Sequence, residues 1–178
     1  MNAPRSFVGG SAISLVERSL PLQVDLRGDP GDARFTGAVR ACLGAALPLV
    51  ANTSAGAGPV TLLWLGPDEW LALGTERSVI GALQRALDDL HCAVTDLSDA
   101  RAAFRIGGRH ARDLLAKGVS LDLHPDAFAA GRCAQTLLAG VTVIVHRHAG
   151  GFDLLVARSH SEYLWAWLAD AAQEFWAG

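Results

Sequence analysis

Apolar and polar positions along this chain alternate every two residues in some segments, as in strands, and repeat about every 3.6 residues in others, as in helices. The order of these segments predicts two similar series of strands and helices. In the first series, Leu20 to Leu26 alternates as a strand. A turn rich in glycine, aspartate and proline separates it from a helix over about Ala33 to Leu43. The series therefore opens as strand, turn and helix.

A hairpin continues this first series. Its strands are expected at Pro59 to Leu65 and Trp70 to Leu73, joined through Pro67 and Asp68. Proline fixes its own φ and aspartate bonds nearby amides, so this turn has well-defined chemistry. A helix capped by Thr75 and running to about Leu90 completes a β-α-β-β-α order.

The second series repeats this order. Its elements are expected at Ala102 to Ile106, Arg109 to Lys117, Ala134 to His148, Phe152 to Ala157 and His160 to Trp176. The sequence thus predicts an α+β fold of two degenerate β-α-β-β-α halves, forming a mixed or antiparallel sheet with helices packed on it.

The expected boundaries follow from these series. Residues 20–90 form the first half and residues 91–178 the second, together one compact unit. Residues 1–19 contain Pro4, Gly9-Gly10 and several serines, which favours a flexible N-terminal arm.

Composition limits the classes of function. Hydrophobic residues make up 51% of the 178 positions, which is ample for a core. A net charge of −3 creates no field that attracts nucleic acid or an anionic membrane. The weakly charged stretch Ala41 to Pro67 is interrupted by prolines and glycines, so it is not expected to span a membrane. No secretory signal is expected either.

The cysteines indicate a reducing compartment. Cys42, Cys92 and Cys133 are odd in number and form no CxxC pair, which is typical of structural thiols in a cytoplasmic protein.

Two features raise the question of a bound ion. Alternation places His146 and His148 on one strand face, but a structural zinc site normally needs four protein ligands, so a polar strand face is the preferred interpretation. Gly107-Gly108 could hold a phosphate at a helix start. It lacks a GxGxxG or GKS/T pattern, and a tight connection is favoured.

Two further groups could support acid–base chemistry. Ser159, His160 and Asp153 contain the residue types of a hydrolytic triad without a GxSxG elbow. Asp122 and His124, with the nearby Asp126, surround a proline and are better explained as a turn. We therefore assign no catalytic, cofactor-binding or metal-binding residue.

The last predicted helix carries a broad apolar arc. Aromatic residues are enriched in the centres of protein interfaces, so this arc supplies the candidate partner-interface residues. They are Tyr163, Trp165, Phe175 and Trp176. Complete coverage of the arc by the protein's own core remains the alternative.

Stretches spread over residues 15–178 resemble, in order, the gamma subunit family of heterotetrameric sarcosine oxidase. They are Pro21 to Gly28, Leu65 to Gly74, Asp96 to Ser98, Gly118 to Pro125 and Arg158 to Ser161. The resemblance implies a complex that oxidatively demethylates sarcosine to glycine, transfers the one-carbon unit to tetrahydrofolate and passes electrons through flavin to oxygen.

The same resemblance implies an accessory, structural role for this chain. Its partners would be the alpha, beta and delta subunits, mainly alpha. The chain itself would bind no cofactor, and FAD, FMN, NAD, zinc and tetrahydrofolate would belong to the other subunits.

The stretch from Asp96 to Leu115 is also similar to the folate-binding aminomethyltransferase fold. That family carries paired aspartates where this chain has Leu138 to Val145, which contains no carboxylate. Without a charge there, steering of proton transfer on folate has no evident basis. A stand-alone folate-binding one-carbon protein or regulator is one alternative, and a self-associating structural module is another.

Overall fold

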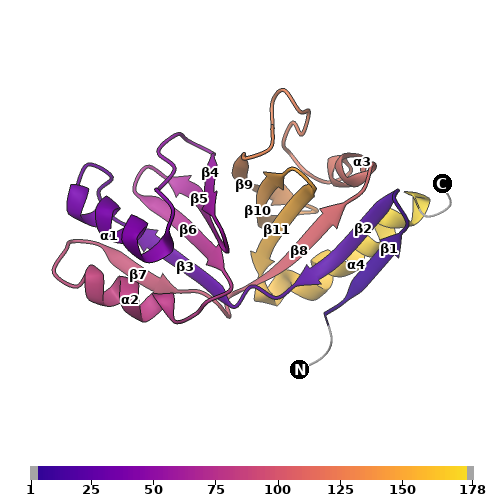
Figure 1. Ribbon diagram of the computed structural model, residues 1–178. Helices are drawn as coiled ribbons and strands as arrows, with labels where there is room; N and C mark the ends of the chain where they lie inside the picture. The colour runs from indigo at the N-terminus through magenta and orange to yellow at the C-terminus, as the bar shows by residue number, and fades with distance from the viewer. Residues whose placement is uncertain (1–3, 176–178) are drawn as a thin grey trace. The chain divides into compact units, whose positions relative to one another are not determined.

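The computed structural model describes residues 4–175, and its contacts divide it into two compact units instead of the one expected. The inner unit is Leu20–Asp99, and the split unit combines the residues up to Ser19 with those from Ala100 onward (Figure 1). The boundary lies beyond residue 90 because the strand Ala93–Asp96 still belongs to the inner unit.

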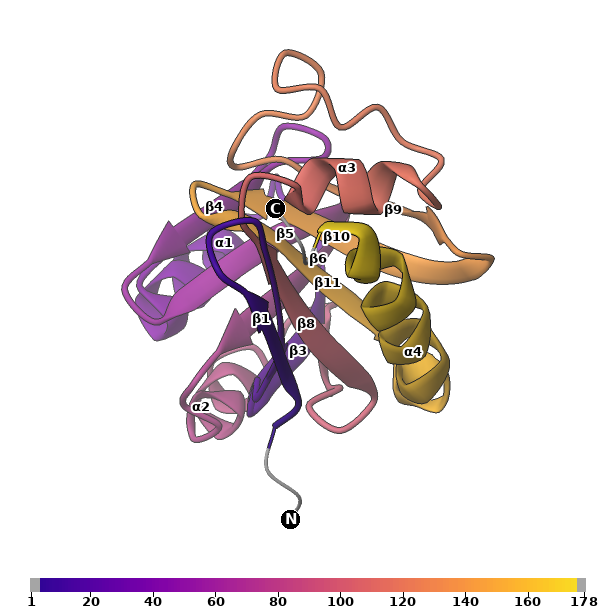
Figure 2. The same cartoon turned by 90° about the vertical axis from the view of Figure 1, so that its right-hand side faces the viewer.

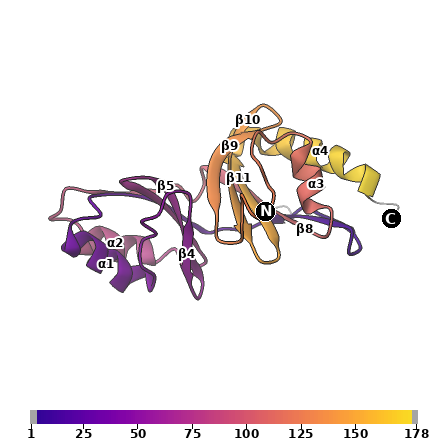
Figure 3. The same cartoon turned by 90° about the horizontal axis from the view of Figure 1, so that it is seen from above.

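The inner unit is a five-stranded antiparallel sheet in the order β4-β5-β6-β3-β7. Its strands are β3 (Leu22–Arg27), β4 (Ser54–Ala57), β5 (Val60–Gly66), β6 (Glu69–Gly74) and β7 (Ala93–Asp96). Its helices are α1 (Ala33–Leu43) and α2 (Val79–Ala86). Figure 3 shows both helices on one side of this sheet, where the core of the inner unit lies.

Helix α1 has the bounds that the sequence predicts, because its ends are defined by local chemistry. The Asp32 carboxylate accepts a hydrogen bond from the Arg34 amide at 2.7 Å, and Gly44 ends the helix with a φ of 71°. Phe35 begins a buried stripe on this helix, and its ring centroid lies 6.0 Å from that of Trp70.

Helix α2 is shorter than expected and begins after Ser78, not at Thr75. Arg77 donates to Asp96 at 3.0 Å, which ties the residues before the helix to β7. The acidic pair Asp88-Asp89 follows the helix, where negative charge opposes the helix dipole.

The split unit is a six-stranded antiparallel sheet in the order β1-β2-β8-β11-β10-β9. Its strands are β1 (Ser6–Gly9), β2 (Ile13–Arg18), β8 (Arg101–Gly107), β9 (Cys133–Leu138), β10 (Val141–His148) and β11 (Gly151–Ala157). Its helices are α3 (Ala111–Ala116) and α4 (Ser161–Ala172), with 3-10 turns η1 (Arg158–His160) and η2 (Gln173–Phe175) on either side of α4. Helices α3 and α4 pack on one face of the sheet (Figure 2).

Residues 4–19 do not form the flexible arm that their composition suggests. They make the β1-β2 hairpin, with Gly10 at a φ of 62° in its turn. Ile13 and Leu15 are fully buried, and Leu15 pairs with Ile106 of β8. The alternation of Ile13 and Leu15 is thus a strand signal, which the surrounding glycines and serines obscure.

The single strand expected over Ala134 to His148 is two strands. Ala139 and Gly140 have φ values of 51° and 81°, so they form a tight two-residue turn between β9 and β10. Alanine rarely adopts positive φ, which is why the sequence pattern conceals this turn.

The two units repeat one another in topology. The sheet order β4-β5-β6-β3 of the inner unit corresponds to β9-β10-β11-β8 of the split unit, with one more strand per half than the sequence predicts. The strand that precedes each repeat joins the other sheet: β2 precedes β3 but pairs with β8, and β7 precedes β8 but pairs with β3. The duplication is therefore confirmed in form, with exchanged leading strands.

Candidate functional site

A buried carboxylate lies at the centre of a polar cluster on the split unit's sheet. Along β11, Phe152 and Leu154 belong to the core beneath the helices, so alternation directs Asp153 to the opposite face. Asp153 is 7% exposed and pairs in register with Arg105 of β8 and His146 of β10. Neighbouring strands thus converge on one carboxylate.

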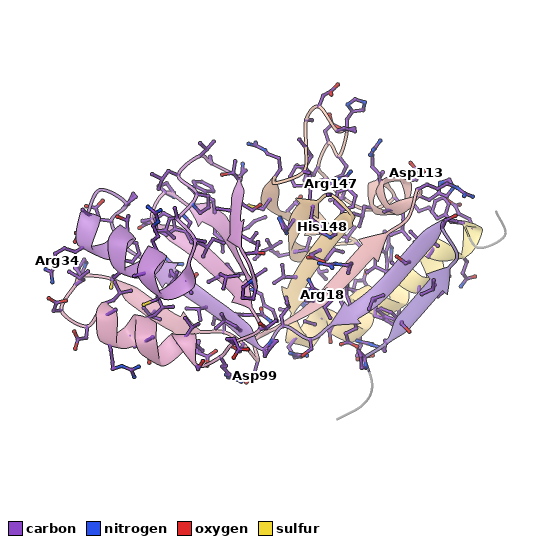
Figure 4. All side chains as sticks on the ribbon, in the orientation of Figure 1. Arg18, Arg34, Asp99, Asp113, Arg147 and His148 are labelled. Carbon is purple, nitrogen blue, oxygen red and sulfur yellow. The ribbon has the colours of Figure 1, made fainter. Side chains whose placement is uncertain are left out.

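Asp153 is held by charged hydrogen bonds. Arg105 donates to both carboxylate oxygens at 2.8 Å, and Arg18 of β2 donates to one of them at 3.2 Å. His148 Nε2 lies 3.7 Å from Asp153 Oδ1. Figure 4 labels Arg18 and His148 on the strands of this unit.

The electrostatics keep this carboxylate ionised. Burial alone would raise the pKa of Asp153, but the hydrogen bonds and charge of Arg105, with the charge of Arg18, lower it. An ionised carboxylate saturated by two guanidinium groups is a poor general acid or base. The cluster is therefore suited to holding strands together.

The two histidines of this cluster share one face, as alternation predicts, with ring centroids 6.1 Å apart. Burial lowers the pKa of His146 to about 4 and also lowers the pKa of His148. Between residues 4 and 175, no group of three His, Cys, Asp or Glu side chains is arranged to hold a metal ion.

Buried His146 makes folding stability pH-dependent. Its pKa is lower in the folded chain, so between about pH 6.5 and 4 the unfolded chain binds more protons. Stability is therefore expected to fall as the pH is lowered through this range, by on the order of 3 kcal/mol in total. Urea unfolding at several pH values gives the free energy of unfolding as a function of pH. This dependence on pH should be weaker for His146→Gln than for the wild type. The matched change His124→Gln, at an exposed site, should leave the pH dependence of the free energy of unfolding unchanged. If His146→Gln also left it unchanged, His146 would not be its source.

A second polar cluster lies on the inner unit's sheet. Arg27 bridges two carboxylates, with its Nε 3.1 Å from Asp25 Oδ2 and its Nη2 2.9 Å from Glu69 Oε1. Burial, with the charge of Asp25, raises the pKa of Glu69. Sequence reasoning missed this pair because it arises from the register of β3 on β6, in which Arg27 lies opposite Glu69.

An open hollow of about 820 Å³ adjoins this second cluster. Its lining consists of Arg27, Gly28, Asp29, Pro30, Pro67, Asp68, His91, Cys92 and Ala93. Its lining carries charges of both signs. Burial raises the pKa of the Cys92 thiol, so a smaller fraction of it is present as the reactive thiolate.

The other groups considered from sequence are structural. Asp153 bonds to arginines, whereas Ser159 and His160 lie exposed in η1, so no triad forms among them. His124 is at an exposed turn, where its amide donates to Asp122 at 2.8 Å. A Cβ on Gly108 would lie 2.5 Å from the Ala12 carbonyl oxygen, which explains this glycine by close packing.

The predicted interface residues have different environments. The ring of Trp165 lies 5.6 Å from that of Phe104, and the Arg5 guanidinium lies 5.0 Å above its indole. Phe175 stacks on His110 with ring centroids 4.8 Å apart. The split unit's own residues therefore cover much of both rings.

The other two predicted interface residues differ. Tyr163 is 52% exposed, and its hydroxyl donates to the Ala139 carbonyl at 2.8 Å. Trp176 lies outside the described residues. The interface at these four residues stays a prediction.

No helix within residues 4–175 has the length and apolarity to cross a bilayer.

Comparisons with known proteins identify the relatives of this chain. Residues 27–174 match the model of the sarcosine oxidase, gamma subunit family. The sarcosine oxidase subunit gamma of an Arthrobacter species is 38% identical over 92% of this chain and 82% of its own length. The same subunit of Corynebacterium sp. strain P-1 is 36% identical over 92% of this chain and 81% of its own length.

Solved structures agree with this relationship. A chain of the heterotetrameric sarcosine oxidase from Corynebacterium sp. U-96, in complex with pyrrole 2-carboxylate, superposes with a TM-score of 0.88 at 33% identity, covering 95% of this chain and 88% of that one. Aminomethyltransferase T of the Bartonella henselae glycine cleavage system shares the fold, with a TM-score of 0.59 at 14% identity over 89% of this chain and 43% of its own. This chain therefore belongs to the sarcosine oxidase gamma subunit family.

Proposed function

We propose that this chain is the accessory gamma subunit of a heterotetrameric sarcosine oxidase in the cytoplasm. The observation that supports this most strongly is the similarity to a chain of such an enzyme over 95% of the length at 33% identity. In this proposal the assembled enzyme oxidatively demethylates sarcosine to glycine and transfers the one-carbon unit to tetrahydrofolate.

The role proposed for this chain within the complex is structural. The buried carboxylate Asp153 is saturated by arginines, and burial lowers the pKa of both neighbouring histidines. The hairpin stretch Leu138 to Val145 offers no carboxylate where the aminomethyltransferase family carries aspartates. These features do not favour chemistry on this chain, so we propose contact with the other subunits as its role.

The partners in this proposal are the alpha, beta and delta subunits, with alpha as the main contact. FAD, FMN, NAD, zinc and tetrahydrofolate would be held by those subunits.

Purification from the native host tests this proposal. The tagged chain, expressed at native abundance, is expected to recover three companions in stoichiometric amounts by mass spectrometry, and the recovered complex should oxidise sarcosine. An untagged strain gives the background. Recovery of the chain alone, under conditions that preserve other complexes, would reject the accessory role. Saturable binding of tetrahydrofolate to the isolated chain would then favour the stand-alone folate-binding alternative.

A further inference from the structure

The two strands of the N-terminal hairpin are held by different means. Ile13 and Leu15 of β2 are fully buried, and β2 pairs with both β1 and β8. β1 is the terminal strand of the sheet, and its Ser6 and Val8 are exposed (Figure 1). Short edge strands with little apolar burial open at a lower free energy than the core of a domain. Contacts other than apolar burial must therefore help to hold β1 in place.

Arg5, directly before β1, supplies such contacts through charged hydrogen bonds. Its Nε donates to Glu17 Oε2 at 2.9 Å, and its main-chain amide donates to the same oxygen at 3.3 Å. Its Nη1 donates to Glu162 Oε2 at 2.8 Å. Glu17 belongs to β2 and Glu162 to the first turn of α4, so one guanidinium joins the hairpin to the helix. Hydrogen bonds between charged groups are stronger than those between neutral groups.

The same guanidinium lies over two aromatic rings. The Arg5 Cζ is 5.0 Å from the centroid of the Trp165 ring and 5.8 Å from that of the Phe104 ring. Phe104 is fully buried, whereas Trp165 is only partly buried. A guanidinium at this distance is attracted to the face of an aromatic ring. Arg5 therefore both holds the start of β1 and covers the face of the Trp165 indole beneath it.

The two carboxylates that bind Arg5 differ in their exposure to water. The side chain of Glu17 is 22% exposed, and that of Glu162 is 85% exposed. The hydrogen bond from Arg5 lowers the pKa of Glu17, so this pair stays charged at neutral pH. An exposed ion pair such as that with Glu162 is weakened by salt. The contacts of Arg5 therefore form a charged latch, one half of which is sensitive to ionic strength.

We propose that residues 4–9 form a strap that opens and closes over the indole of Trp165, with Arg5 as its latch. In the closed form, which is the form in the structure, Arg5 covers Trp165 and Phe104. In the open form Arg5 leaves its two glutamates, β1 separates from β2, and both rings become accessible. β2 stays in the sheet, because its buried side chains hold it there. This motion belongs to the chain itself and does not depend on the proposed function.

Hydrogen–deuterium exchange of the full chain tests the latch. Arg5→Ala should make peptides that cover residues 4–9 exchange about tenfold faster, because loss of the charged hydrogen bonds raises the population of the open form. Peptides from β8 and β11, in the centre of the same sheet, should exchange as in the wild type. Arg109→Ala is the matched control, since Arg109 is exposed in the same unit, and it should leave the exchange unchanged.

Two results of this exchange experiment would overturn the proposal. If residues 4–9 of Arg5→Ala exchange as slowly as in the wild type, β1 is held without the latch. If β8 and β11 exchange faster to the same extent as residues 4–9, Arg5 stabilises the whole unit and no separate strap exists.

Quenching of tryptophan fluorescence by acrylamide tests the covering of Trp165 independently. The signal of Trp165 is the difference between each chain and the same chain with Trp165→Phe. Arg5→Ala should increase the quenching of this signal. So should about 1 M sodium chloride with the wild type, because the Debye length is then about 3 Å and the exposed ion pair is screened. Arg5→Lys keeps the charge but loses the planar fork, so its quenching should be intermediate. Equal quenching of Trp165 in the wild type and Arg5→Ala would show that the strap does not cover the indole, and the proposal would fail.

Discussion

The double variant Ile13→Ala, Leu15→Ala is expected to unfold most of the split unit at room temperature. Both side chains are fully buried in the core beneath α3 and α4. Truncating a buried isoleucine or leucine to alanine costs about 2 to 5 kcal/mol, so the pair should lose about 4 to 10 kcal/mol. That loss is comparable to the whole stability of a typical domain, about 5 to 15 kcal/mol. Urea unfolding followed by circular dichroism measures the change.

The control for this prediction is Val8→Ala on the adjacent strand β1. Val8 is 63% exposed, so this change should alter the free energy of unfolding by less than about 0.5 kcal/mol. A double variant as stable as Val8→Ala would show that β2 is dispensable. Residues 4–19 would then behave as the flexible arm that their composition suggests.

This strand shows why part of the fold escapes sequence analysis. Helix α1 is predictable because Asp32 and Gly44 define its ends within a few residues. The place of β2 beside β8 and of β7 beside β3 depends on pairing between distant segments, which no local pattern records. β4 is hidden for another reason, since Ser-Ala-Gly-Ala has little intrinsic strand preference.

The candidate site divides in the same way. Alternation along one strand correctly places His146 and His148 on a common face. The arginine partners of Asp153 come from β2 and β8, so they follow from sheet register and not from spacing in the sequence. The two polar clusters could therefore be identified only from the structure, whereas the strand face that carries the histidines could be predicted from the sequence.

Asp153→Asn is expected to destabilise the chain by about 1.5 to 3 kcal/mol at pH 7. The change removes the charge that Arg105 and Arg18 share, and it leaves their guanidinium groups beside a neutral amide. The cost comes from the lost charged hydrogen bonds of the buried carboxylate, and water that reaches the partly exposed guanidinium groups keeps it below the cost for a fully buried ion pair. Thermal and urea unfolding of the isolated chain measure the loss.

Two comparisons separate a partly buried ion pair from an ordinary surface contact. Asp89→Asn breaks the exposed pair with Arg34 and should cost no more than about 1 kcal/mol. The double variant Arg105→Met, Asp153→Leu should regain part of the stability lost in Asp153→Asn, since apolar replacements remove the closest pair of charges together and leave only the partly exposed Arg18 without its partner. If Asp153→Asn costs no more than Asp89→Asn, water reaches the carboxylate, and the cluster does not stabilise the sheet. If the double variant is the less stable of the two, the charges contribute net stability, and the Asp153 cluster is an electrostatic link between β2, β8 and β11.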